Sequence, residues 1–214
     1  MRIKTQVLIT LLAFALSSGS NSCVKSKSKH TYPFSQEFKD HTLFKTNSWW
    51  VYQLDGAATR DSVYVFQSDV GVADPSHLNY KYESYIIQSR STHLGESVIQ
   101  SGVAATPDVY NSDFQRFTYS SSLGADIVAY FSRQNPGYKF VLFPSHETEY
   151  KQQVATLIVN GITYNNVKIF EALKASSNDQ RLPKVICFAP KIGIVRKELY
   201  NGQVWNLVKH QVVQ

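Results

Sequence analysis

The chain has 214 residues, of which 22 are Lys or Arg and 16 are Asp or Glu, so its formal charge is +6. This mild basic excess is spread along the chain, which argues against a nucleic-acid-binding protein. The two cysteines form no Cys-x-x-Cys pair, so neither a disulfide framework nor a zinc motif is predicted. Tyr, Phe and Trp are abundant, and together with Val and Ile they favour pleated surfaces and indicate a mainly β protein.

The first 23 residues have the pattern of an export signal. A short basic start precedes ten apolar residues, 7–16, which is too short for a membrane-spanning helix of ~20 residues. Ser20-Asn21-Ser22-Cys23 resembles a lipobox, the motif after which a lipoprotein signal peptidase leaves an acylated cysteine, although the usual Leu and Ala or Gly are absent. We therefore predict a signal peptide at 1–22 and lipid attachment at Cys23; the alternative is an ordinary secretory signal cut within 17–22.

Residues 23–42 are expected to be a lipidated tether. Three lysines alternate with serines in 24–30, which cannot build a core. Some Bacteroidota-type lipoproteins carry an acidic surface-export signal here, and by that resemblance the basic stretch implies an outer-membrane protein that faces the periplasm. Within the tether, 35–40 is a candidate helical turn. Cleavage leaves 192 residues with a charge of 20 − 16 = +4, and we assign 43–214 to a single domain.

From residue 48 onward the pattern predicts about a dozen strands. Asp55-Gly56, Asn160-Gly161 and Asn201-Gly202 are hairpin signals, and Asn135-Pro136-Gly137 is a tight turn. We read 70–77 and 176–182 as loops, while 167–175 fits either a helix or a strand. The expected strands are 48–54, 61–67, 80–88, 96–100, 114–119, 126–133, 138–143, 150–160, 163–173, 184–189, 192–199 and 204–213.

No βαβ alternation is present, so we predict an antiparallel sheet that forms a half-barrel, barrel or sandwich with at most one or two short helices. The last strand is apolar on both faces. Val204, Val208 and Val212 share one face, and Trp205 and Leu207 share the other. A second layer, or a sheet wrapped around something, is therefore expected.

Two stretches resemble uncharacterised β-rich cell-envelope lipoproteins of the Bacteroidota type. Residues 44–65 match their opening hairpin at Phe44, Trp50 and Tyr52, with an aspartate entering the second strand. Residues 161–208 contain Ala-Pro-x-x-Gly-x-Val and Trp-x-Leu pieces that are similar to their closing strands. The resemblance implies a β fold and an envelope location but no established activity. Trp49, Trp50 and Trp205 then become expected core residues, with an aromatic ligand platform as the alternative.

No catalytic constellation is recognisable. The six histidines form no HExxH or i, i+4 pair, and the glycines form no phosphate-binding or nucleophile-elbow motif. Ser145-His146-Glu147 is the densest polar cluster, but neighbours on one strand point to opposite faces, so a polar loop is favoured over a triad. Cys187 lies in an apolar run and is expected to be buried and inert. His210 is expected to be a partly buried strand residue.

Several aspartates fall at expected loops and strand ends, where two of them converging would make a glycosidase-type pair. They are Asp61, Asp69, Asp74, Asp108, Asp113 and Asp126.

These observations predict a non-enzymatic protein without metal or cofactor, held at the membrane by its lipid anchor, that binds or scaffolds another envelope component. An open, apolar-lined half-barrel would indicate a lipid or acyl-chain ligand. The alternative is a protein-interaction subunit of an envelope complex, whose mark is an exposed aromatic patch. A glycan hydrolase is the third hypothesis.

Overall fold

The computed structural model describes residues 28–93, 97–104, 106, 112–119, 126–132, 139–143, 146–172 and 183–214. The predicted signal peptide, Cys23 and the predicted turn and loop at 135–137 and 176–182 lie outside the described residues. The elements are β1 (His30–Tyr32), α2 (Gln36–Thr42), β2 (Trp49–Leu54), β3 (Arg60–Ala73), β4 (Tyr80–Ser91), β5 (Ser97–Val103), β6 (Ser112–Tyr119), β7 (Asp126–Ser132), β8 (Lys139–Phe143), β9 (His146–Val159), β10 (Ile162–Ala172), β11 (Pro183–Ala189), β12 (Gly193–Leu199) and β13 (Val204–Gln211).

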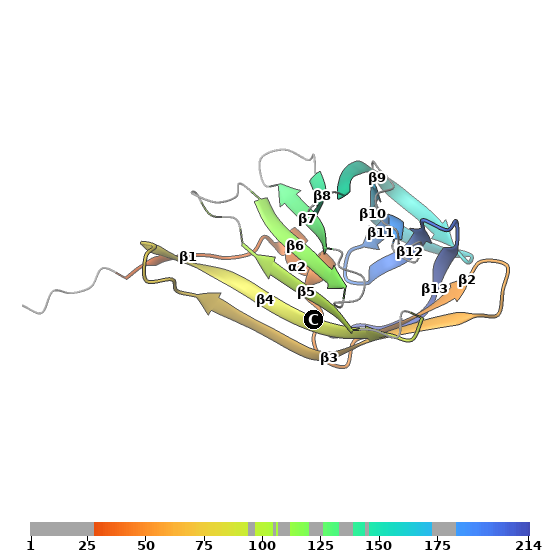
Figure 1. The fold of residues 1–214 in the computed structure, drawn as a ribbon, viewed down its shortest axis with the longest axis horizontal. Helices are drawn as coiled ribbons and strands as arrows, with labels where there is room; N and C mark the ends of the chain where they lie inside the picture. Colours follow the sequence, from red (N-terminus) through yellow and green to blue (C-terminus); the bar gives the residue numbers. More distant parts are fainter. Residues whose placement is uncertain are drawn as a thin grey trace, which may run out of the picture.

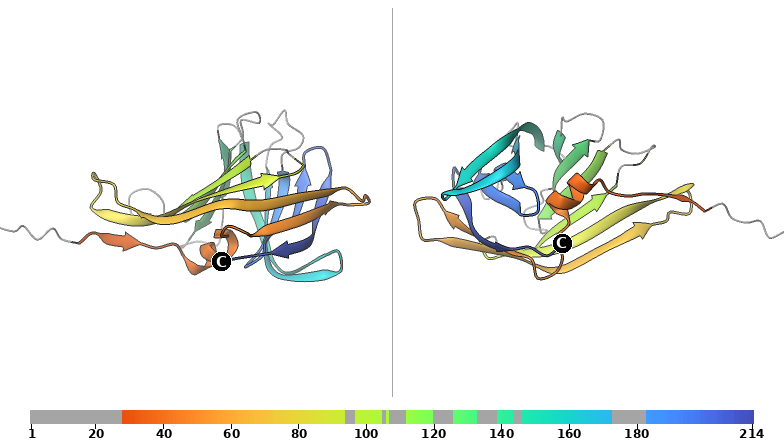
Figure 2. Two further views of the ribbon diagram at one scale, coloured as in Figure 1. Left: turned by 90° about the horizontal axis from the view of Figure 1, so that it is seen from below. Right: turned by 180° about the vertical axis from the view of Figure 1, so that it is seen from behind.

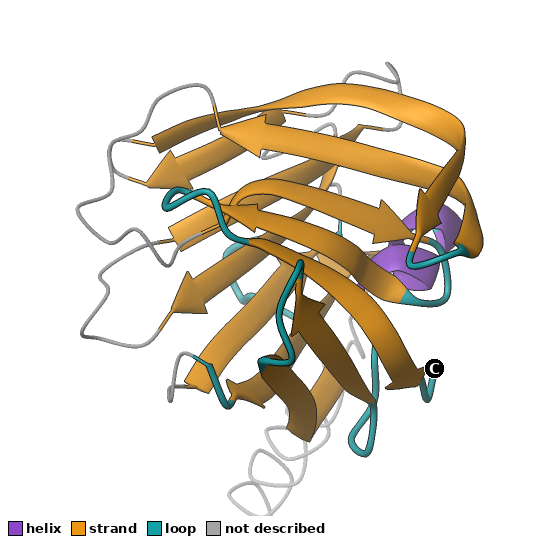
Figure 3. Ribbon diagram, turned by 90° about the vertical axis from the view of Figure 1, so that its right-hand side faces the viewer, coloured by secondary structure: helices purple, strands orange, loops and turns teal. Residues whose placement is uncertain are grey.

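All the described strands belong to one curled sheet (Figures 1 and 3). Their order is β1-β4-β3-β2-β13-β12-β11-β10-β9-β8-β7-β6-β5, and β5 also pairs with β4. Every pairing is antiparallel except that of β1 with β4. The predicted class is confirmed: the protein is mainly β, with an antiparallel-dominated sheet curled into a half-barrel and one short helix among the described residues.

The folded part begins earlier than the predicted boundary at residue 43. β1 pairs with the start of β4, and α2 is capped by Ser35, whose Oγ accepts from the Phe38 amide at 3.2 Å. Phe34 and Phe38 are buried, with their rings 5.8 and 6.0 Å from that of Tyr85 on β4. A helix this short is unstable alone, so this packing stabilises it on the inner side of the sheet (Figure 2). Residues 30–42 are therefore part of the folded domain and not a tether.

Several strand boundaries differ from the prediction. β3 continues to Ala73 through residues that we expected to be a loop, because they pair with Tyr82–Tyr85 of β4. The ambiguous 167–175 is strand as far as Ala172, the last residue described there. Asn160-Gly161 forms the predicted two-residue turn, with both φ values positive, 51° and 77°. The two other hairpin signals lie in longer connections.

The two stretches that carry the resemblance meet in the core. Trp50 Nε1 donates to the Ile192 carbonyl, and the Tyr52 hydroxyl donates to the Ile194 carbonyl at 3.0 Å. Gly193, at φ 93°, lies between them, and a Cβ there would be 3.1 Å from the Phe44 ring. The glycine thus serves both the turn and the close approach of the aromatic side chains.

β13 is covered on both faces from Trp205 to Leu207, whereas Val204 and Val208 are only partly buried and Lys209–Gln211 are exposed. Trp205 and Leu207 are fully buried on the inner face. On the outer face the tip of the β9–β10 hairpin folds against the strand, where Asn160 Nδ2 donates to the Leu207 carbonyl at 3.3 Å. Trp50 and Trp205 are core residues as expected, whereas Trp49 is only partly buried.

Candidate functional site

The inner face of β2–β5 and β10–β13 is occupied by a continuous packed core. Among the side chains that the structure describes, twenty-two buried ones form a hydrophobic cluster with members from α2, β2–β5 and β9–β13. The aromatic members Phe38, Phe170, Phe188 and Trp205 have at most 2 % of their surface exposed. Along these strands the inner face is therefore filled by the protein's own side chains.

A buried ion pair lies on this inner face. Asp61 of β3 is fully buried, and its carboxylate accepts from Lys197 Nζ at 2.6 Å, Ser91 Oγ at 2.8 Å and the His93 amide at 3.0 Å. The Lys197 Nζ also lies 4.6 Å from the centroid of the Tyr52 ring, a cation–π contact. The pair joins strands that are 136 residues apart in sequence.

The environment keeps this carboxylate charged. Burial alone would raise the pKa of Asp61, but the Lys197 charge and the hydrogen bonds from Lys197, His93 and Ser91 outweigh it and hold the pKa below its ordinary value. A carboxylate so fully satisfied is a poor general acid or base at neutral pH. We interpret the pair as a structural clamp.

The candidate aspartates are not brought together as a catalytic pair among the described residues. Asp61 and Asp74 stand at opposite ends of β3, and the register of β6 with β7 separates Asp113 from Asp126. Asp69 is exposed on β3, and Asp108 lies outside the described residues. The glycosidase-type arrangement therefore gains no support.

A second buried charge fastens α2 to the sheet. Lys168 of β10 is 1 % exposed, and its ammonium group pairs with Glu37 on the helix. Burial lowers the pKa of Lys168, and Glu37 offsets part of that shift. His41, whose Nδ1 is 2.7 Å from the Glu37 carbonyl, also has a pKa lowered by burial. This cluster lies between helix and sheet and serves their packing.

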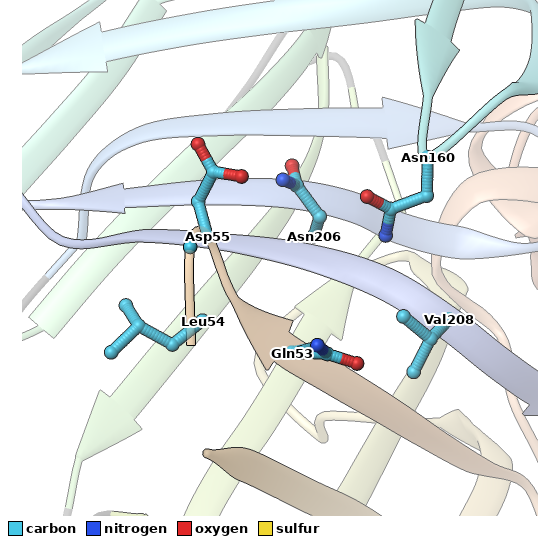
Figure 4. Close-up of a pocket in the computed structure, with 7 residues that line it drawn as sticks. Gln53, Leu54, Asp55, Asn160, Asn206 and Val208 are labelled. Atoms are coloured by element: carbon cyan, nitrogen blue, oxygen red, sulfur yellow. The ribbon is translucent and has the colours of Figure 1, made fainter. Parts of the chain in front are cut away.

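A hollow of about 280 Å³ lies on the opposite, outer face of the sheet, where the β9–β10 tip meets β2 and β13. Asp55, after the end of β2, and Asn160, at the β9–β10 tip, lie on the same side of β13 as the Asn206 side chain (Figure 4). The side-chain oxygen of Asn206 is buried without a hydrogen-bond partner among the described residues. These polar groups do not suit an acyl chain. The lining residues are Gln53, Leu54, Asp55, Gly56, Asn160, Asn206 and Val208.

Apolar side chains gather on the outer face of β3, β4 and β5. Their exposed fractions are 38 % for Tyr64, 39 % for Phe66, 49 % for Ile86 and 40 % for Ile99. Arg90 lies among them, with its guanidinium carbon 5.7 Å from the centroid of the Phe66 ring. The strand registers place Tyr64 opposite Arg90 and Ile99 opposite Gln88. Gln88 and Arg90 are two residues apart on β4, so these side chains share one face of the sheet. We call these five residues (Tyr64, Phe66, Ile86, Arg90 and Ile99) the outer patch.

β3 also has an open edge beside the outer patch. β2 pairs only with Arg60–Tyr64, and the segment before β2 follows the edge as far as Ser68, whose Oγ accepts from the Thr46 amide at 3.0 Å. From Asp69 to Ala73 the described strands pair β3 with β4 alone. This stretch contains no lysine or proline, and Asp69 is its only charged residue. Proteins usually protect such an edge with charges, proline or a covering element. An open edge next to exposed aromatic residues is the strongest candidate site in the described structure.

The other predicted residues have clear places. Cys187 is buried, and burial raises the pKa of its thiol to about 11, as expected for an inert cysteine. His146 and Glu147 begin β9 and are not in a loop, whereas Ser145 lies outside the described residues. His210 is exposed on β13. Sequence reasoning missed the buried roles of Lys168 and Lys197, although the apolar neighbours of Lys168 in Val167-Lys168-Ile169 were a signal.

No family model matches the chain, and neither the curated proteins nor the solved structures include a significant match. The resemblance to envelope lipoproteins therefore stays a prediction. Within the described ranges no three His, Cys, Asp or Glu side chains are grouped to hold a metal ion. In the same ranges no helix has the length and apolar character needed to span a membrane.

Proposed function

We propose that this protein is a lipoprotein of the bacterial envelope, anchored to the outer membrane through Cys23 and facing the periplasm. Its β domain acts as a non-enzymatic scaffold that binds a protein partner. The observation that carries the proposal is the open edge of β3 beside the outer patch. The anchor rests on the lipobox-like sequence.

The edge suits an extended partner segment. Strand addition pairs the free backbone groups of a sheet edge with those of a second chain, and alternate side chains then provide specificity. Aromatic residues and arginine are enriched in protein interfaces, and the outer patch offers both. A segment added at Asp69–Ala73 would continue the sheet and place its side chains beside the patch.

A lipid-carrier function has weaker support. Such a carrier needs an apolar cavity, whereas the described inner strands enclose a packed core and the hollow beside β13 is lined largely by polar groups. We therefore favour a protein partner over a lipid or acyl chain as the ligand. Mass spectrometry of lipid extracted from the purified protein tests this preference, and stoichiometric bound lipid would reverse it.

Site-specific photo-crosslinking in cells tests the partner site. A crosslinker placed at Asp69 or at Ala73 should give the same defined adduct, and Val72→Lys, which adds a charge to the edge, should abolish it. Ile158→Lys is the matched control, because Ile158 is exposed on the distant β9–β10 hairpin. Adducts that survive V72K, or that I158K removes equally, contradict the proposal.

The anchor has its own test. Cys23→Ala should release the protein from the membrane fraction and remove incorporated radioactive palmitate. Unchanged fractionation of the variant would refute acylation at Cys23. This measurement is independent of the crosslinking result, so the anchor and the partner site can fail separately.

A further inference from the structure

We infer that the tip of the β3–β4 hairpin rests on the anionic headgroups of the membrane. The tip consists of residues 74–81 and the adjoining Lys29. The inference rests on the proposed acylation of Cys23 and adds an orientation to it. The partner surface is a bilayer, recognised by charge and held close by the length of the linking chain.

The length of the chain between Cys23 and the fold limits how far the hairpin tip can lie from the membrane. Seven residue steps separate Cys23 from His30, so a fully extended link spans at most about 25 Å. His30 pairs with Tyr80, directly after the hairpin turn, so the chain enters the fold at the tip (Figure 1). β3 has 14 residues, which at ~3.3 Å per residue is about 45 Å. The tip is thus the part of the hairpin nearest to the anchor, and the opposite end of β3 lies beyond the reach of the link.

The charges of the tip suit an anionic surface. Asp74 forms ion pairs with both Lys29 and Lys81, at 2.8 and 2.9 Å. One carboxylate thus faces two ammonium groups, and the tip carries a net positive charge. The sequence adds Lys25 and Lys27 between Cys23 and the fold. Basic residues next to a membrane are attracted to anionic lipid within about one Debye length.

The tip also presents accessible groups on the side from which the chain arrives. His30 and His77 are exposed, and the Lys29 and Lys81 side chains retain 28 % and 37 % of their surface. Pro75 lies in the turn after β3, and its backbone carbonyl accepts a hydrogen bond from Lys29 Nζ at 3.0 Å. The ion pairs therefore fix Lys29 to the hairpin, so the link cannot swing freely at its last residue.

The test uses the acylated full chain in vesicles of phosphatidylethanolamine and phosphatidylglycerol. A fluorophore is attached at His77→Cys, on the tip, and at Ala58→Cys, an exposed position at the opposite end of β3. A quencher carried on lipid headgroups should quench the fluorophore at residue 77 and leave the one at residue 58 bright. Insertion of twenty Gly and Ser residues after Lys27 should reduce the difference.

A charge variant gives the second arm. The double variant Lys29→Gln/Lys81→Gln should lower the equilibrium constant for contact between the tip and anionic vesicles, about fivefold for each lysine lost. Quenching at residue 77 should therefore fall on anionic vesicles and stay unchanged on purely zwitterionic vesicles. Equal quenching at residues 77 and 58 in protein that co-floats with the vesicles overturns the inference and leaves the anchor standing. Failure to co-float refutes both. Excimer emission from pyrene placed at residue 77 would assign the tip to contact between two copies, which also overturns the inference.

Discussion

Replacing Asp61 by asparagine tests how the curled sheet is held together. Asparagine keeps the shape of the side chain, and its oxygen can still accept from Ser91 and the His93 amide, which both bond to Oδ1. Its NH₂ group would replace Oδ2 and face the Lys197 ammonium group, which bonds to that oxygen at 2.6 Å. The substitution therefore exchanges an attractive contact for a donor facing a donor.

The expected cost follows from burial. Removing one partner of a buried ion pair costs about 3–5 kcal/mol, because the other charge is left uncompensated. The Lys197 side chain is 12 % exposed and lies over the rings of Tyr52 and Trp205, which leaves it some stabilisation. We therefore expect D61N to destabilise the fold by about 3 kcal/mol. The double variant D61N/K197M removes both charges and should cost less than the sum of the single variants by about 2 kcal/mol.

Urea unfolding of the unlipidated chain, followed by tryptophan fluorescence, measures these differences. The pKa of Asp61 is held below its ordinary value in the folded state, so the unfolded state takes up the proton first as the pH falls. The contribution of the pair is present above the unfolded pKa of about 3.9 and disappears as the pH falls through the folded pKa. The difference in the free energy of unfolding between wild type and D61N should therefore become smaller as the pH falls over that range. A cost below about 1 kcal/mol at neutral pH, or strict additivity in the double variant, would refute the reasoning.

Three further predictions concern packing and reactivity. Gly193→Ala should lower the free energy of unfolding by about 3 kcal/mol, and Gly202→Ala should lower it by about 1 kcal/mol, as measured by urea titration. Both glycines have a positive φ, but of the two only Gly193 has neighbouring atoms that an added Cβ would meet. Cys187, whose thiol pKa is raised to about 11, should react with iodoacetamide at alkaline pH only after unfolding, and fast labelling of the folded protein would contradict its burial. Glu37→Gln should destabilise by about 2 kcal/mol and Lys168→Met by less than about 1 kcal/mol, because only the first keeps the buried Lys168 charge while it removes the Glu37 charge that offsets its burial; equal costs would contradict that asymmetry.

Local signals explain which parts of the fold were predictable. A two-residue hairpin turn depends only on the backbone conformations of its two central residues, and Asn160 and Gly161 both adopt the positive φ that it needs. Trp50 and Trp205 sit in strongly apolar strands and are buried. Strand type and approximate position follow from such short-range information.

Other features depend on contacts between distant residues. Phe34 and Phe38 are isolated aromatic residues in a polar stretch, and only the curled sheet gives them a place to be buried. The end of β3 contains Gly71, which looks like part of a loop until β4 pairs with it. The Asp61–Lys197 pair spans 136 residues, and neither partner shows its role in its own neighbourhood. Burial of a charge is decided by the completed sheet.

Under the proposed acylation of Cys23, the early start of the fold shortens the link between the domain and the membrane. A flexible tether over residues 23–42 would let the domain reach up to about 65 Å from the anchor. Because β1 pairs with β4 and α2 packs on the core, only the link before His30 is available, and the reach falls to about 25 Å. The open edge, Asp69–Ala73, runs directly into the hairpin tip. With the proposed anchor, a partner that adds a strand there would be held within about 40 Å of the bilayer, the sum of that reach and about five strand residues. We therefore expect the proposed partner to be a component that is itself close to the membrane surface.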